Sequence, residues 1–236
     1  MTTDSTGNAM TERGVSANAP AASAGAQSAE NASETGTAAH KEGGDARALL
    51  SEADRAFVDS LLDRILADTP TDADIQGVTA ELGRYPRGMV AVGRRCAVCG
   101  TPLVTVTRPL VEGRIPFPTT FYLCSAAAVK AVGRVEAEGA MADYTELVQH
   151  DDGVRAAYER AHWLYLVFRT SLARRLGDTE DHIAGISVGG MPTRVKCLHA
   201  LLAQTLVMGR GVNPIGDRAL ARIADEFSPD VCRCHR

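Results

Sequence analysis

Aromatic residues are scarce in this sequence, and its first forty-odd residues contain none. Phe, Trp and Tyr make up 5% of the 236 residues, with a single Trp. The opening segment consists largely of Ala, Ser, Thr, Gly, Asn and Glu, with almost no large aliphatic side chain. Such a composition buries too little apolar surface to offset the entropy that is lost when a chain becomes ordered. We therefore expect a disordered tail over residues 1–47.

The chain also lacks an apolar run long enough to cross a bilayer, and its N-terminus lacks the basic-then-apolar pattern of a secretory signal. Both absences predict a cytoplasmic protein with no membrane span. Because that compartment is reducing, the six cysteines are better interpreted as free thiols or metal ligands than as disulfides.

Charge of one sign is not in large excess either. The net charge is −4, and the predicted tail carries −3 of it, so no global field would draw the remainder onto nucleic acid. Arginine is concentrated locally, with six arginines and one acidic residue between Arg84 and Arg114. Such a cluster can bind an anion, although a solvated sheet face is the commoner explanation. We expect no nucleic-acid partner, and either an anionic small molecule or a protein remains open.

An α+β fold is predicted for residues 48–228. Three short runs at 89–95, 103–110 and 119–124 are rich in β-branched and aromatic residues and are bounded by Gly and Pro, as is typical of an antiparallel meander. Apolar spacing and capping residues predict helices around these runs, and the one expected from Pro192 is apolar on nearly every side. The sequence therefore predicts a single domain in which a small three-stranded antiparallel sheet packs against a mostly helical body. Residues 229–236 are expected to form a flexible tail.

The strongest chemical signal is Cys96-Ala97-Val98-Cys99-Gly100 between two predicted strands. Two cysteines separated by two residues in a tight turn can direct both sulfurs at one tetrahedral metal ion. A complete site needs further ligands. The candidates are Cys124, Cys197 and His199, which are favoured, and also Cys232, Cys234 and His235 near the C-terminus. We expect zinc, with an iron–sulfur cluster less favoured, and the alternative is that these residues are ordinary free thiols. Whether the C-terminal Cys232, Cys234 and His235 take part stays open.

A second signal lies before the apolar helix. Gly189 and Gly190 precede Pro192, and Arg194 and Lys196 follow it. Backbone amides that converge at a helix start favour an anion, and Arg194 could add a bidentate contact to phosphate or carboxylate. The spacing is not that of a Walker loop, and an ordinary loop-to-helix junction is the alternative.

Cys197 and His199 also suggest a nucleophile and its base. Two residues that are two positions apart on a helix point in directions about 200° apart. We therefore do not expect these side chains to face each other.

Three stretches occur in an order and spacing that resemble a bacterial family, the domain of unknown function 501, over residues 73–227. They are Pro116-Phe117-Pro118-Thr119 before Phe121-Tyr122-Leu123, Gly189-Gly190-Met191-Pro192 before Arg194-Val195-Lys196-Cys197-Leu198-His199, and Gly211-Val212-Asn213-Pro214 before Gly216-Asp217. The family has no established activity, so the resemblance implies a class and not a reaction. Its members tend to carry Cys or His one position after Cys124, where this chain has Ser125. Its genes resemble neighbours of those for a septum-formation initiator and an exopolyphosphatase.

Three functions remain open from the sequence. The first is a binding or regulatory protein whose thiol site ties Cys96 and Cys99 to Cys124, Cys197 or His199. The second is an enzyme that acts on a phosphorylated or other anionic small molecule through the helix start at Gly189–Arg194. The third is a scaffold linked to cell division. No complete set of acid, base and nucleophile is recognisable, which disfavours the enzyme.

Overall fold

A computed structural model describes residues 46–234. The predicted tail over residues 1–47 lies almost wholly outside the described residues, and His235 lies outside them too. The described elements are, in chain order, η1 (Ala46–Leu49), α1 (Glu52–Ala67), α2 (Asp72–Leu82), β1 (Met89–Arg95), β2 (Pro102–Thr107), β3 (Leu110–Val111), β4 (Ile115–Pro116), β5 (Phe121–Leu123), α3 (Ala126–Ala137), α4 (Ala140–His150), α5 (Asp152–Leu176), η2 (Asp181–Ile183), α6 (Leu198–Met208) and α7 (Pro214–Arg222). None of these helices is long and apolar enough to span a bilayer.

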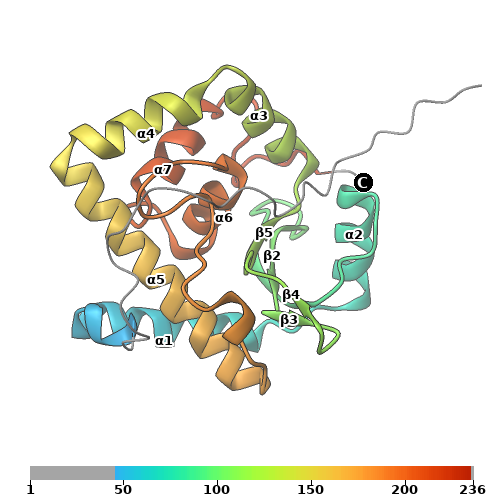
Figure 1. Cartoon of the computed structure of the whole chain (residues 1–236). Helices are drawn as coiled ribbons and strands as arrows, with labels where there is room; N and C mark the ends of the chain where they lie inside the picture. The colour runs from blue at the N-terminus through green and yellow to red at the C-terminus, as the bar shows by residue number, and fades with distance from the viewer. Residues whose placement is uncertain (1–45, 235–236) are drawn as a thin grey trace, which may run out of the picture. The chain divides into compact units, whose positions relative to one another are not determined.

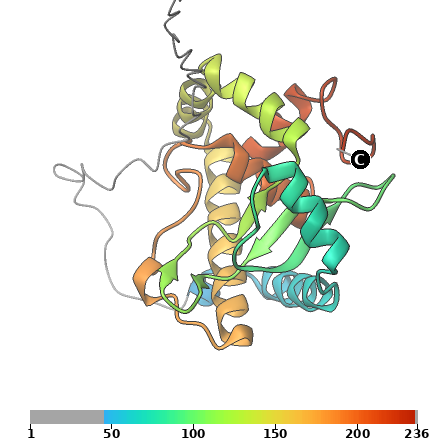
Figure 2. The ribbon, with the colours of Figure 1, turned by 90° about the vertical axis from the view of Figure 1, so that its right-hand side faces the viewer.

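The fold is α+β, as the sequence predicts. Strands β1, β2 and β5 form a three-stranded antiparallel sheet in the order β1-β2-β5, and β3 pairs with β4 in a separate hairpin. The central strand, β2, is buried along its whole length. Helix α2 lies against one side of the sheet and α6 lies on the other, while α1 contacts β1 (Figures 1 and 2). Because both faces are covered, β2 reads as a continuous Leu-Val-Thr-Val run instead of an alternating one.

Helix α6 lies at the centre of the core, as its all-round apolarity predicts. All of its side chains except that of His199 are buried, and the helix packs against the sheet, α3 and α7 (Figure 1). Its one buried amide side chain, Gln204, donates to the carbonyl of Ala161 and accepts from Asn213. The polar atoms on this helix are therefore bonded inside the core, which removes the cost of burying them.

The predicted start of α6 is wrong. The helix begins at Leu198 and not at Pro192, and the segment between them is a looped turn. Gly189 and Gly190 have positive φ angles of 65° and 90°, which side chains other than glycine rarely adopt. Their carbonyls accept hydrogen bonds from the amides of Lys196 and Arg194, so the loop closes on itself before the helix starts.

Other helix starts agree with the capping pattern in the sequence. Ser51, Thr71, Asp151 and Asn213 each accept hydrogen bonds from amides in the first turn of the helix that follows. Helix α4, which follows directly after Gly139, was not predicted from the sequence. Gly139, with a φ of 90°, separates α3 from α4.

Candidate metal centres

A tight turn between β1 and β2 presents the first two cysteines. The amide of Cys96 donates to the carbonyl of Thr101 at 2.8 Å, and that of Gly100 donates to the carbonyl of Cys96 at 2.9 Å. Gly100 adopts a φ of 77°, which closes the turn. Cys96 is buried and Cys99 is exposed, so one cysteine of the turn lies on its core side and the other on its surface side.

The C-terminal segment beyond α7 meets this turn. Phe227 is buried, and Ser228 forms a β-bridge with Val231, which folds the chain back on itself. The carbonyl of Pro229 accepts a hydrogen bond of 2.9 Å from the amide of Ala97, inside the cysteine turn. Pro229, which was expected to begin a flexible tail, thus makes a specific backbone contact with the cysteine turn.

Four sulfurs converge where the two segments meet. The Sγ atoms of Cys96, Cys99, Cys232 and Cys234 all lie within 4.8 Å of one another. Four thiolates about 2.3 Å from a tetrahedral zinc ion are about 3.8 Å apart, so small side-chain rotations would complete the site. The CxxC turn was therefore identified from the sequence, but the C-terminal cysteines were among its candidate partners without being the favoured ones. The structure brings Cys232 and Cys234 to the turn, where Cys124, Cys197 or His199 had been favoured.

The thiols in this group influence one another's ionisation. The Thr101 hydroxyl, 3.3 Å from Cys99 Sγ, acts with the thiols of Cys232 and Cys96 to lower the pKa of Cys99 to about 6. Burial, together with the nearby Cys99 and Cys96, raises the pKa of Cys234. The Cys99 thiol thus loses its proton readily, whereas the Cys234 thiol keeps its proton, as expected where two negative charges would lie close together.

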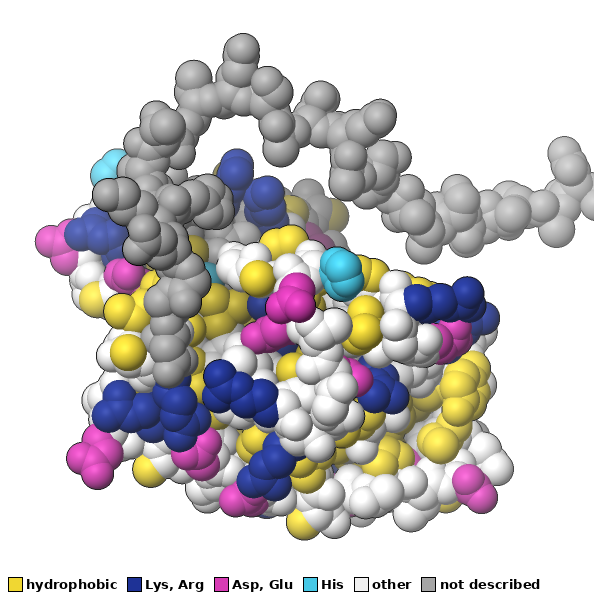
Figure 3. Space-filling model, turned by 60° about the horizontal axis from the view of Figure 1, so that its bottom comes forward, with side chains coloured by type: hydrophobic (Ala, Val, Ile, Leu, Met, Phe, Trp, Pro, Cys, Tyr) yellow, Lys and Arg dark blue, Asp and Glu magenta, His cyan; other side chains and the backbone are white. Residues whose placement is uncertain are grey.

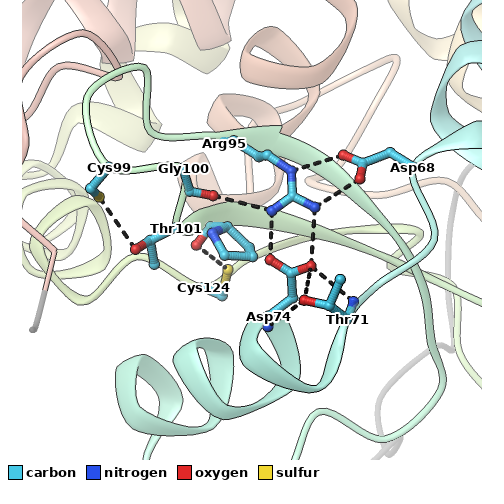
Figure 4. Close-up of polar contacts among 9 residues, drawn as sticks. Asp68, Thr71, Asp74, Arg95, Cys99, Gly100, Thr101 and Cys124 are labelled. Atoms are coloured by element: carbon cyan, nitrogen blue, oxygen red, sulfur yellow. Dashed lines mark hydrogen bonds and ion pairs between the residues drawn. The ribbon is translucent and has the colours of Figure 1, made fainter.

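An ion-pair network fixes the base of the cysteine turn. Arg95, which directly precedes Cys96, donates to the carboxylates of Asp68 and Asp74 and to the carbonyl of Gly100 (Figure 4). Asp74 is also the capping-box residue of α2, bonded to Thr71. Its interaction with Arg95 lowers the pKa of Asp74 to about 2. The turn is therefore held to the end of α1 and the start of α2, which limits its movement whether or not a ligand is bound.

Cys124 lies outside the four-sulfur group. Its thiol donates to the carbonyl of Pro102 at 3.3 Å (Figure 4). Burial raises its pKa to about 12, so this thiol stays protonated at neutral pH. Cys124 is thus placed as a small core residue with a satisfied hydrogen bond.

Cys197 and His199 belong to a second group, with Glu136 from α3. The reactive atoms of these three side chains lie within 4.8 Å of one another. The expectation that Cys197 and His199 would point apart is wrong, because Cys197 is the N-cap residue and not part of the helix. Its extended backbone, with φ −155° and ψ 109°, brings Sγ to 4.0 Å from His199 Nδ1.

The charge on this second group is set by the three side chains together. His199 Nδ1 lies 3.1 Å from Glu136 Oε1. The thiol of Cys197 and the carboxylate of Glu136 raise the pKa of His199 to about 10. Against the opposing effect of burial, the contact with His199 lowers the pKa of Glu136.

The predicted anion site at the glycine loop is differently arranged. Because α6 starts at Leu198, its first amides are far along the chain from Gly189 and Gly190. The amide of Leu198 donates to the carboxylate of Glu136, so the protein itself supplies an anion at this helix start. Arg194 is exposed, and Lys196 lines an open hollow beside α4.

The arginine-rich stretch is largely neutralised within the described residues. Four of its six arginines form ion pairs, and on the face shown in Figure 3 most basic side chains lie beside acidic ones. The pairs are Arg94–Asp230, Arg95–Asp68 and Asp74, Arg108–Asp178 and Arg114–Glu112. Arg84 and Arg87, which form no ion pair with any described residue, line a cavity of about 150 Å³ beside Phe117 and Tyr122. Structural pairing thus accounts for most of the local charge excess.

The sequence of the chain matches one known protein family. The pattern of the family described as protein of unknown function (DUF501) matches residues 92–221. The chain belongs to this DUF501 family. The matched residues include Cys96, Cys99, Glu136, Cys197 and His199, whereas Cys232 and Cys234 lie beyond them. No curated protein and no solved structure shows significant similarity to the chain.

Proposed function

We propose that this DUF501 protein is a zinc-binding protein of the reducing cytoplasm, in which one zinc ion is held by Cys96, Cys99, Cys232 and Cys234. The observation that carries the proposal is the convergence of four sulfurs from two segments that lie far apart in the sequence. All-thiolate tetrahedral sites are typical of structural zinc. Such a site leaves no position for water or substrate, so its role is in folding and binding and not in catalysis.

The surroundings of the four sulfurs fit this role. Cys96 and Cys99 are positioned by a turn that Arg95 holds to α2, and Cys232 and Cys234 are positioned by the hydrogen bond between Ala97 and Pro229. Zinc bound to both pairs would join the C-terminal segment to the sheet, because each pair alone supplies only half of the ligands. The same four thiols could hold iron, but redox chemistry is not required to explain their arrangement.

Metal analysis of purified variants tests the proposal. We expect Cys99→Ser and Cys232→Ser each to lose one equivalent of zinc per chain, because hydroxyl oxygen is a poor replacement for a thiolate ligand. Cys124→Ser is the matched control: it removes a thiol outside the group and keeps a donor for the Pro102 carbonyl. The control should retain all of its zinc.

Two results would count against the proposal. One is equal zinc content in wild type, Cys99→Ser and Cys124→Ser. The other is a wild type purified without chelator that contains no metal and whose cysteines in the group form disulfides. An intense visible absorption with stoichiometric iron would replace zinc by iron at the same four ligands.

A further inference from the structure

The second group, Glu136, Cys197 and His199, brings together three different donor types. A carboxylate comes from α3, a thiol from the N-cap of α6, and an imidazole from the first turn of α6. Nδ1 of His199 is 3.1 Å from Glu136 Oε1 and 4.0 Å from Cys197 Sγ. In a tetrahedral zinc site, ligand atoms of these types are about 3.3–3.6 Å apart. The two distances bracket that range.

The imidazole is oriented as a ligand. Its Nε2 lies 3.2 Å from the carbonyl oxygen of Val129 on α3, which fixes the proton on that nitrogen and leaves Nδ1 facing the other two donors. Histidines that bind metals usually donate their second nitrogen to a carbonyl or carboxylate in this way. The contact with Val129 therefore holds the ring with Nδ1 directed at the group, where a metal ion would displace the proton of that nitrogen.

The other two donors are also held in place. The amide of Leu198 donates to Glu136, which fixes the carboxylate at the start of α6. The chain entering Cys197 is anchored by the amide of Val195, which donates to the Thr145 hydroxyl at 2.9 Å. The backbone on both sides of the sulfur is thus fixed before any ligand is bound.

We infer that Glu136, Cys197 and His199 form a second metal site, for a divalent zinc-like cation, with one coordination position open to an exchangeable ligand. Three protein ligands are the number typical of catalytic zinc, whereas structural sites use four. A thiolate and a carboxylate together balance the charge of a divalent ion. All three side chains are partly exposed, with 20% of Glu136 and 28% of His199 accessible, so a fourth ligand can reach the site from solvent.

This site is separate from the four-cysteine site in both residues and chemistry. No residue is shared between the two groups. The four-cysteine group is complete, while the second group can accept a small anionic or neutral oxygen or nitrogen ligand. Metal content can therefore distinguish the two sites.

Zinc analysis of the full-length protein tests the inference. We expect two zinc ions per chain in wild type and one in both His199→Gln and Cys197→Ser, with the four-cysteine site still filled. The retained ion shows that these variants are folded. His150→Gln is the matched control, because His150 is an exposed helix-end histidine whose Nδ1 lies 2.8 Å from its own helix carbonyl at Glu146. It should keep both ions.

Cobalt substitution tests the open position. In cobalt-loaded Cys99→Ser protein, which keeps only the second site, azide should shift the visible bands as it enters the fourth position, and His199→Gln in the same background should abolish the bands. A cobalt spectrum insensitive to azide would overturn the open position.

The stoichiometry separates failure of this inference from failure of the four-cysteine proposal. A single zinc that is lost in Cys99→Ser and kept in His199→Gln would overturn the second site alone. A single zinc with the opposite pattern would overturn the four-cysteine site alone. Rapid iodoacetamide labelling of Cys197 that is unaffected by added zinc would assign the group as a thiolate–imidazolium pair and contradict the inference.

Discussion

At the scale of single residues, His162 shows how burial changes chemistry in the core. It lies on α5 with 5% of its surface accessible, and its Nδ1 is 2.8 Å from the Ser187 hydroxyl. The Trp163 ring packs against it at 4.6 Å between centroids. Burial, aided by the positive charge of Arg169, lowers the pKa of His162 to about 4. This histidine is therefore neutral in the folded protein at any pH above that value.

A neutral buried histidine makes stability depend on pH. Between pH 6.5, where the unfolded side chain takes up a proton, and pH 4, only the unfolded state is protonated, so stability falls as the pH falls. The contribution is ~2 kcal/mol between pH 7 and pH 5. We expect His162→Gln to lose less stability over this interval than wild type, as measured by urea unfolding at the two pH values. Parallel curves for the two proteins would show that His162 does not titrate in this way.

Residue patterns predicted half of the four-cysteine group. The spacing of Cys96 and Cys99 indicates a metal-binding turn because both ligands lie within one local structure. Cys232 and Cys234 carry a weaker local signal, and their approach to the turn depends on how α6, α7 and the segment after Phe227 pack. No spacing rule encodes that long-range contact. An even count of four thiols in two close pairs was the one clue available in the sequence.

At the scale of elements, the packing of α7 on α6 depends on a glycine. Gly216 lies in the first turn of α7, and a Cβ atom there would come closer than 3 Å to the Leu201 carbonyl and the Thr205 hydroxyl. Both belong to α6, whose backbone is fixed at the centre of the core. The two helices can thus approach closely only where the side chain is absent.

Alanine at Gly216 should therefore disrupt this contact. We expect Gly216→Ala to destabilise the protein by about 1–3 kcal/mol, the usual cost of overpacking a core. Gly133→Ala is the matched control, because Gly133 lies within α3 with no atom within 4 Å of the added Cβ. It should stabilise the protein by up to about 1 kcal/mol through helix propensity. Thermal unfolding of both variants checks the pair, and equal effects would contradict the close contact of α6 and α7.

Helix starts were predictable where a capping residue lies next to an apolar run. They were not predictable where a loop carries the same residue signal as a helix start. Asn213 followed by Pro214 marks the start of α7 correctly. Pro192 gives a similar signal, but Gly189 and Gly190 close a hydrogen-bonded loop around it and delay the helix to Leu198. That delay places Cys197 at the N-cap and brings it to His199. The error in the helix start thus caused the error about this pair.

At the scale of the whole domain, the two candidate sites lie at joints between distant segments. The four-cysteine group joins the β1–β2 turn to the C-terminal segment, and the second group joins α3 to α6. The free energy of metal binding at such a site adds to the stability of the folded state, because the unfolded chain does not hold the ligands together. Zinc should therefore determine the position of the C-terminal segment more than that of the core.

The central claim is that four thiolates bind one zinc ion, and zinc K-edge X-ray absorption tests it most directly. The measurement is best made on His199→Gln, in which only the four-cysteine site remains. We predict a single shell of four sulfurs at about 2.3 Å from zinc. A shell dominated by nitrogen or oxygen at about 2.0–2.1 Å would contradict the assignment of Cys96, Cys99, Cys232 and Cys234.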